Sequence, residues 1–213
     1  KALGLDINNE DDAWKFADIV LKKYIESTNA AVRKYSSTTT IFHNSGHIPK
    51  GNYGFIKANT HLELESLPTG GWGYDHFPLS AAYVRTLKGT DFLGMTGKFH
   101  HSWGEFGGFK HPNALIYETS LSIANGAGCS IGDQMHPLGE MNMSTYKLIG
   151  KAYAHIEERE PWINGAVNIE DIAVLSAESI TGNRDVKADI GANRMMLENN
   201  YLYDFIGCTM DFS

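Results

Sequence analysis

Side chains able to bind or transform a substrate are concentrated between residues 91 and 134 of this sequence. That segment reads DFLGMTGKFHHSWGEFGGFKHPNALIYETSLSIANGAGCSIGDQ and holds three histidines, a tryptophan, several phenylalanines and eight glycines. A surface loop rarely contains so many aromatic and ionisable side chains. The segment therefore predicts a binding surface that alternating strands and helices carry.

Two acidic residues on one face of an expected strand are the first candidates for catalysis. In THLELES, Glu63 and Glu65 alternate with Leu62 and Leu64, so both carboxylates share the face opposite the leucines. Acidic side chains are seldom buried without a partner, so the pair indicates either an interior ion pair or a functional group. Because functional residues of parallel α/β folds gather where strands end, Glu65 is one of two leading candidates, with Glu105, and Glu63 would hold Glu65 or a neighbouring histidine in place.

Glu105 and Asp133 are the other candidate catalytic carboxylates. Glu105 follows KFHHSW, in which Lys98 and His101 are cations that would keep a neighbouring carboxylate ionised. An ionised carboxylate is what a nucleophile or a charge stabiliser requires, and a solvated loop acid is the alternative interpretation. Asp133 ends the apolar run GCSIG and is the third candidate.

Polar and aromatic side chains at the same expected strand ends are candidates for binding a substrate. They are His43, Asn44, Glu63, Trp72, Tyr74, Asp75, His76, Lys98, His101, Trp103 and Gln134. Trp72 and Trp103 lie in glycine-rich turns, where an indole can stack on a ligand or, alternatively, pack in the core. For His43 the alternative is a hydrogen bond within its own loop.

A metal site is the competing chemical interpretation. His100, His101, Glu105 and His111 lie within twelve residues of one another. However, no HExxH, HxH or CxxC spacing occurs, and adjacent histidines usually point apart. The sequence therefore favours carboxylate chemistry, with no metal and no cofactor expected.

Composition limits the class of protein. The 213 residues are 42% hydrophobic and 20% charged with a net charge of −7, which is typical of one large or two small globular domains. Scattered basic residues argue against nucleic acid as a partner, and no apolar run approaches the roughly 20 residues of a membrane span. Cys129 and Cys208 form no CxxC pair, so a reducing compartment is compatible and the cytoplasm is slightly favoured.

Alternating strands and helices are expected along residues 1–160. A first helix presents Trp14, Ala17, Leu21 and Tyr24 on one face, and Asn9 suits its start. The strands expected after it lie within 37–47, 55–71, 92–95 and 128–134, and the helices within 76–87, 112–126 and 144–159. The helix between the first two strands is expected to be short or to be replaced by residues 50–55, KGNYGF. This order predicts a parallel sheet with helices outside it.

A domain boundary is expected near Glu160-Pro161, where the pattern begins again. A strand is expected within 169–179 and a helix within 185–207. A single β-α unit of this length cannot bury a core of its own, so residues 161–213 are interpreted as the truncated start of a second domain.

Three motifs resemble those of a known group of enzymes. GGWGYDHFPL, FLGMTGKFHHSWGEFGGFKHPNAL and SIANGAGCSIGDQMHP resemble the glycoside hydrolases described as the hypothetical glycosyl hydrolase 6 family. These are similar to the family 42 β-galactosidases and to α-L-fucosidase-like proteins. The resemblance covers nearly the whole chain.

The resemblance implies a fold and an assembly. Residues 1–160 would be the C-terminal half of a (β/α)8 TIM barrel, and residues 161–213 the first β-α unit of a flavodoxin-like trimerisation domain. The protein would then be a homo-oligomer, most simply a trimer. The general acid/base would lie upstream of Lys1, and the family 42 nucleophile would fall around Thr96, which has no carboxylate. Either Glu65 or Glu105 takes that role, or the chemistry uses other positions.

Two functions remain open from the sequence. The first is a glycoside hydrolase, β-galactosidase-like or α-L-fucosidase-like, that cleaves a terminal glycosidic bond of a carbohydrate substrate with carboxylates at strand ends. The second is a non-catalytic sugar-binding or assembly fragment of a larger protein, whose glycine-rich loops only shape an interface.

Overall fold

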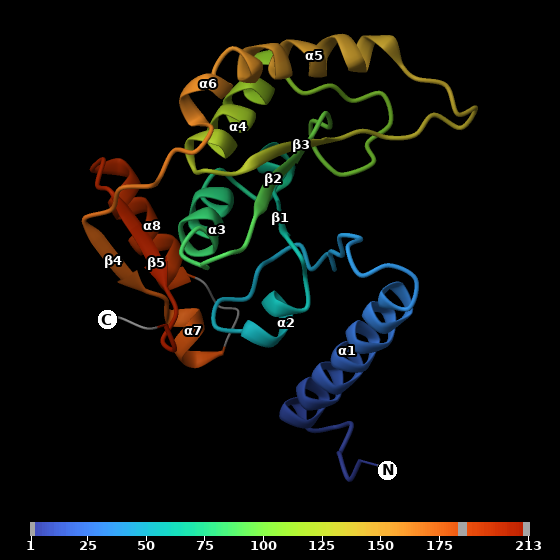
Figure 1. Ribbon diagram of the computed structural model, residues 1–213, viewed down its shortest axis with the longest axis vertical. Helices are drawn as coiled ribbons and strands as arrows, with labels where there is room; N and C mark the ends of the chain where they lie inside the picture. Colours follow the sequence, from blue (N-terminus) through green and yellow to red (C-terminus); the bar gives the residue numbers. More distant parts are fainter. Residues whose placement is uncertain (1–2, 183–186, 211–213) are drawn as a thin grey trace.

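The computed structural model describes residues 3–182 and 187–210 and shows an α/β architecture with parallel strands (Figure 1). One sheet has the strand order β1-β2-β3 and a second has the order β4-β5. The strands are β1 (Leu62–Glu65), β2 (Phe92–Gly97), β3 (Gly128–Gly132), β4 (Ile172–Leu175) and β5 (Tyr203–Ile206). Every pairing is parallel, as the alternation of strands and helices predicts.

Helices connect and cover these strands. The longer ones are α1 (Glu10–Arg33), α3 (His76–Val84), α4 (Pro112–Ala124), α5 (Met143–Glu157) and α8 (Lys187–Glu198). The short ones are α2 (Tyr53–Lys57), α6 (Glu160–Ile163), α7 (Ala177–Thr181) and the 3-10 turn η1 (Pro68–Gly70). Within the described ranges, no helix combines the length and apolar character needed to cross a bilayer.

The alternation of β1 places its carboxylates on one face of the sheet. Leu62 and Leu64 are 0% and 2% exposed, whereas Glu63 and Glu65 are half-buried. Glu65 is in register with Met95 of β2, and Met95 with Ser130 of β3, so these three side chains form one row across the sheet. The expected separation of leucines and glutamates is confirmed.

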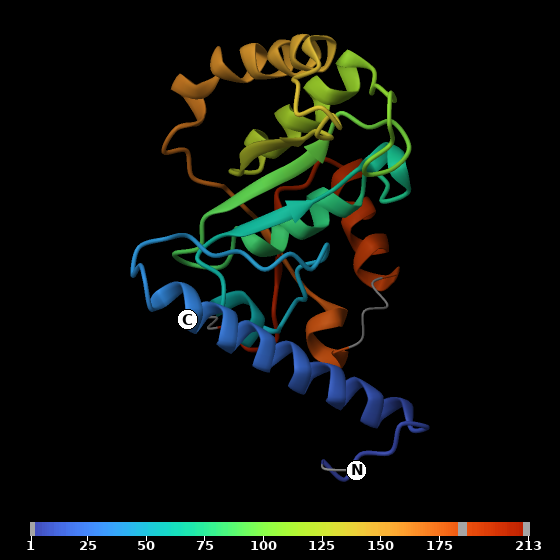
Figure 2. The same cartoon turned by 90° about the vertical axis from the view of Figure 1, so that its right-hand side faces the viewer.

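Helix α3 is buried on all sides. All residues from Phe77 to Val84 are buried, and the sequence FPLSAAYV is apolar around its whole circumference, which is typical of an enclosed helix. One side of α3 packs on β1, and the other contacts β5 and α8 (Figures 1 and 2). Strand β5 and helix α8 therefore share a core with the three-stranded sheet, and Tyr203 and Phe205 belong to it.

The prediction of a strand within residues 37–47 is wrong, because this segment pairs with no strand in the described part of the chain. Side chains take the place of the backbone acceptors that a neighbouring strand would supply. The Ile41 amide donates to Thr60 Oγ1 and the His43 amide to Asn59 Oδ1, at 2.8 and 2.6 Å. One hydrogen bond between backbone groups joins the two segments: the Thr60 amide donates to the Ile41 carbonyl at 2.9 Å. The strand expected within residues 55–71 is reduced to β1, because α2 occupies its beginning.

The helix expected over residues 185–207 is also too long. It ends at Glu198, and residues 203–206 form β5 instead. Asn200 adopts a left-handed φ of 56°, and the Tyr201 amide returns to the Met196 carbonyl, which ends the helix as a C-cap does. Burial of Tyr203 and Phe205 against α3 then favours a strand. The expected helical residues 185 and 186 lie outside the described ranges.

Helix α1 exposes most of its apolar side chains. Asn9 caps it as predicted, since its side chain accepts from the Asp12 amide at 3.2 Å. Of the helix itself only Ile25 is buried, whereas Trp14 and Tyr24 of the expected apolar face are 60% and 55% exposed. The helix points away from the sheet (Figure 2). Phe16, Ile19 and Val20 extend this exposed apolar surface.

We expect residues 1–213 alone to self-associate, because an apolar surface of this kind is rarely left in contact with water. Sedimentation over a hundredfold concentration range should show species larger than a monomer. The variant Phe16→Glu with Val20→Lys places an i,i+4 ion pair on α1 and should reduce the association. A parent chain that remains monomeric throughout would contradict the expectation.

Candidate active site

A carboxylate and an amide meet at the carboxyl end of β1. The Asn44 side-chain amide donates to Glu65 Oε2 at 3.0 Å. Asn44 also accepts from the Gly46 amide at 2.8 Å through its Oδ1, so one side chain links Glu65 to the loop that follows the extended segment. The second oxygen of Glu65 has no hydrogen-bond partner within the described part of the chain and is available to a ligand.

The Trp72 indole lies beside this carboxylate. A β-carbon placed on Gly46 would be 3.1 Å from the indole and 3.8 Å from Glu65 Oε2, so both groups approach the same point of the loop. Gly46 has a φ of +64°, which also favours glycine. The Trp72 ring contacts the His76 ring, with their centroids 4.5 Å apart.

His76 is held neutral beneath Trp72. Burial lowers the pKa of His76 to about 4, and the charge of the neighbouring His47 acts in the same direction. Hydrogen bonds to the backbone of Glu65 and Gly46 only partly oppose these effects. A neutral imidazole in contact with the backbone of both residues supports the geometry around Glu65 rather than supplying charge.

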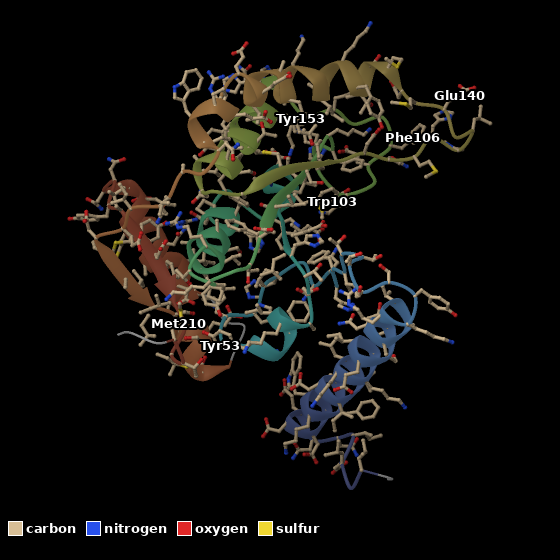
Figure 3. The ribbon with its side chains drawn as sticks, in the orientation of Figure 1. Tyr53, Trp103, Phe106, Glu140, Tyr153 and Met210 are labelled. Atoms are coloured by element: carbon tan, nitrogen blue, oxygen red, sulfur yellow. The ribbon has the colours of Figure 1, made fainter. Side chains whose placement is uncertain are left out.

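Trp103 lies across the carboxyl ends of β2 and β3 (Figure 3). β-Carbons on Gly97 and Gly132 would come within 2.8 and 2.5 Å of its indole, so only glycine leaves room for the ring at both positions. Gly97 and Gly132 are in register, two residues beyond the row that contains Glu65. They lie on the same sheet face as that row. The indole nitrogen is buried and has no hydrogen-bond partner among the described residues.

Glu105 fixes the loop that carries Trp103. Its Oε2 accepts from the backbone amides of His100 and His101 at 3.1 and 2.8 Å, and its Oε1 pairs with His101 Nδ1 at 3.1 Å. These hydrogen bonds from His101 and His100 lower the pKa of Glu105. Of the two residues expected beside Glu105, His101 is its partner, whereas Lys98 lies over the rings of Phe99 and Phe109.

A buried ion pair beneath the same loop was missed by the sequence analysis. Lys110 Nζ donates to Glu118 Oε2 at 2.5 Å and to Thr96 Oγ1 at 3.0 Å, and Thr96 donates to the same Glu118 oxygen at 2.6 Å. The Lys110 and Glu118 side chains are 0% and 4% exposed. Burial lowers the pKa of Lys110, and the bond to Glu118 opposes this.

The sequence did contain a signal for this pair. Glu118 occupies a buried stripe of α4 with Leu115, Thr119 and Ser122, at i, i+3, i+4 and i+7 spacing. A charged residue on such a stripe needs a buried partner. Thr96 points at this stripe, so its side chain faces α4 and not the sheet face that carries Glu65.

The remaining candidates bind protein groups or lie at the rim. Glu63 pairs with His61 at 3.0 Å, His43 bonds Asn29 at 2.7 Å, and Asp133 accepts from the adjacent Gln134 amide at 2.7 Å. The Gln134 side-chain oxygen is buried without a partner in the described ranges.

Tyr74 and Asp75 are engaged in contacts between helices. Tyr74 donates to Glu118 Oε1 at 3.3 Å, and burial together with the Glu118 charge raises the pKa of Tyr74. Asp75 pairs with Arg194 of α8 at 2.5 Å. The structure therefore gathers Asn44, Glu65, Trp72, His76 and Trp103 at one end of the sheet.

No cluster of three or more histidine, cysteine, aspartate or glutamate side chains suited to a metal ion occurs in the described ranges. His100 and His101 make an edge-to-face contact, His101 pairs with Glu105, and His111 caps α4 through the Asn113 amide. The chemistry that the gathered groups allow is that of one carboxylate beside the Trp72 indole, with the Trp103 indole at the ends of the neighbouring strands.

The whole chain is similar to part of a solved glycosidase. It matches α-L-fucosidase isoenzyme 2 from Paenibacillus thiaminolyticus with 51% sequence identity and a TM-score of 0.93. The match covers 100% of this chain and 33% of the fucosidase chain, so the chain spans about a third of that protein's length. No family model and no curated protein matches the sequence. The likeness supports a fucosidase-like relationship for residues 1–213.

Removing the charge of Glu118 should destabilise the fold strongly, because Lys110 would keep a buried ammonium without its partner. We expect Glu118→Gln to lower the free energy of unfolding by about 3–5 kcal/mol in urea titrations of the full-length protein. Replacing both partners, as in Lys110→Met with Glu118→Leu, should recover most of the loss. A loss below about 1 kcal/mol for Glu118→Gln would show that the pair is not buried as a charged unit.

His76 should make stability depend on pH. The pKa of His76 is about 4 in the folded protein, whereas its ordinary value is 6.5. As the pH falls, His76 therefore becomes protonated in the unfolded chain at a higher pH than in the folded protein. This contribution to stability is complete above pH 6.5 and decreases as the pH falls toward 4. His76→Asn should flatten the stability of the full-length protein between pH 7 and 5. An unchanged slope would contradict the neutral buried state.

Proposed function

We propose that the protein containing this chain is a glycoside hydrolase that removes terminal α-L-fucose residues. The observation that carries the proposal is the match along the whole chain, at 51% identity, to an α-L-fucosidase. The same observation favours a fucosidase over a β-galactosidase. The gathered carboxylate and indoles agree with it, since a glycosidase needs acidic groups and flat apolar faces for the sugar ring.

The sheet geometry is compatible with part of a (β/α)8 barrel. Strand β1 places Leu62 and Leu64 toward the helices, whereas Glu63, Glu65 and Ser130 lie on the opposite face of the sheet, as the interior residues of a barrel strand do. We propose that residues 1–160 belong to such a barrel. Residues 161–213 would begin a further α/β domain, with a homo-oligomer as the expected assembly.

Glu65 is the carboxylate that we assign to catalysis. It lies at a strand end, and one of its oxygens has no hydrogen-bond partner among the described residues. The Trp72 indole lies beside it. Hydrolysis requires a second carboxyl group, about 5 Å away for retention and about 6.5–9.5 Å for inversion. The chain spans about a third of the related fucosidase, so we place the second acid in the remainder of the protein.

Trp103 and Trp72 are the surfaces that we assign to the sugar. L-Fucose carries a methyl group in place of a hydroxymethyl group, so it offers more apolar surface to an indole than galactose does. Glu105 would act indirectly in this arrangement, because both of its oxygens hold the loop of Trp103. Asp133 is a weaker candidate, since it bonds the next residue along the chain.

Glu65→Gln should lower kcat of the full-length protein on 4-nitrophenyl α-L-fucopyranoside by at least a thousandfold, about 4 kcal/mol in barrier terms. Glu105→Gln should mainly raise KM, because the Trp103 loop loosens. Glu158→Gln, at an exposed position beyond α5, is the matched control. Unchanged thermal stability of Glu65→Gln would separate catalysis from folding.

A panel of nitrophenyl glycosides on the wild-type protein tests the substrate class. Hydrolysis of β-galactosides instead of α-L-fucosides would overturn the fucosidase assignment, and binding of L-fucose without any hydrolysis would favour the non-catalytic function. Near-normal turnover by Glu65→Gln and Glu105→Gln together would show that both residues are structural.

A further inference from the structure

A buried carboxylate of α7 reaches the loop that precedes α2. Glu178 Oε1 pairs with His47 Nε2 at 2.7 Å and Glu178 Oε2 with Lys50 Nζ at 2.9 Å. The Glu178 and Lys50 side chains are 3% and 1% exposed. Glu178 is 131 residues downstream of His47, so only the tertiary fold brings them together.

The charge of Glu178 is maintained by its two partners. Burial alone would raise the pKa of this carboxyl group, but the hydrogen bond from His47 and the charge of Lys50 lower the pKa below its ordinary value. A buried carboxylate with both oxygens bonded has little freedom to move.

Helix α7 presents Glu178 rigidly. Asp189 of α8 accepts from the Ala177 amide and from the Ser176 hydroxyl, both at 2.7 Å, at the first residues of α7. The backbone of the neighbouring loop also lies close, since a β-carbon on Gly51 would be 3.2 Å from Ser179. Glu178 is therefore a fixed point for the loop and not a flexible surface side chain.

The loop that Glu178 holds is the loop that shapes the site. Asn44 donates to Glu65, Gly46 lies under Trp72, and His47 follows directly. The His47 ring also faces the His76 ring, with centroids 6.2 Å apart. A shift of residues 44–50 would therefore move the hydrogen-bond donor of Glu65 and the contact beneath Trp72 together.

We propose that Glu178 is a positioning residue for the active site, which holds the loop 44–50 through His47 and Lys50 and thereby sets Asn44 against Glu65. The inference rests on the proposed function for its effect on turnover. Residues beyond 160 then do more than complete the core, because they determine the geometry around a carboxylate at the end of β1.

Hydrogen exchange of the full-length protein tests the contact itself. Glu178→Gln should accelerate amide exchange in residues 43–51 at least tenfold. The matched control is Asp204→Asn, which removes a buried carboxylate paired with Arg85 between the same two parts of the chain. Asp204→Asn should leave exchange in residues 43–51 unchanged. If both variants accelerate it equally, the effect is general loosening and the proposal fails.

Kinetics on 4-nitrophenyl α-L-fucopyranoside test the consequence for the site. Glu178→Gln should lower kcat/KM at least tenfold, and Asp204→Asn less than twofold. In a double-mutant cycle, the variant with both Asn44→Ala and Glu178→Gln should lose no more kcat/KM than the more impaired single variant, because both substitutions act through one loop. Additive losses would overturn the proposal.

A second variant covers the case in which Glu178→Gln does not fold. His47→Ala keeps the Lys50–Glu178 pair and should show the same local exchange and the same lack of additivity with Asn44→Ala. If the wild-type protein hydrolyses no glycoside, the proposed function fails. The exchange measurements then still decide whether Glu178 holds the loop.

Discussion

The enclosure of α3 is the constraint on which the arrangement of this chain depends. Burying an aliphatic or aromatic side chain contributes roughly 1.5–3 kcal/mol, and α3 offers such side chains on every side. A helix of this kind is stable only between two layers, so the β4–β5 unit with α8 must pack on it opposite the three-stranded sheet. The position of α3 in turn sets the loop before it, which carries Trp72, and its first residue, His76.

Buried ion pairs then set the positions of loops that apolar packing alone does not determine. Apolar contacts have little directional preference, whereas an ion pair with bonded oxygens defines the distance and orientation of the segments that it joins. Lys110 and Glu118 define the base of the loop that carries Trp103, where the Lys110 amide also bonds the Lys98 carbonyl. Glu178 does the same for the loop that carries Asn44. Both pairs lie beside the groups gathered at the carboxyl end of the sheet.

The two kinds of carboxylate in this chain can be told apart by their unused oxygens. Glu105, Glu118 and Glu178 each have both oxygens bonded to protein groups within the described ranges, and each holds a loop or a helix. Glu65 accepts one hydrogen bond there and lies beside an indole. That difference, rather than proximity to histidines in the sequence, distinguishes Glu65 from Glu105 as a carboxylate with capacity for a ligand.

Local features of this chain could be predicted from the sequence, because they depend on the spacing of neighbouring residues. The alternation in LELE placed Glu65 opposite the leucines, and Asn9 marked the start of α1. Other features depend on contacts between segments that are distant in the sequence. The Ile41 and His43 amides donate to side chains and not to a neighbouring strand. Residues 203–206 form β5 because α3 covers them. Glu178 pairs with His47, which lies 131 residues earlier in the chain. These outcomes depend on which distant groups satisfy a buried amide, apolar face or charge, and a pattern of neighbouring residues carries no information about that partner.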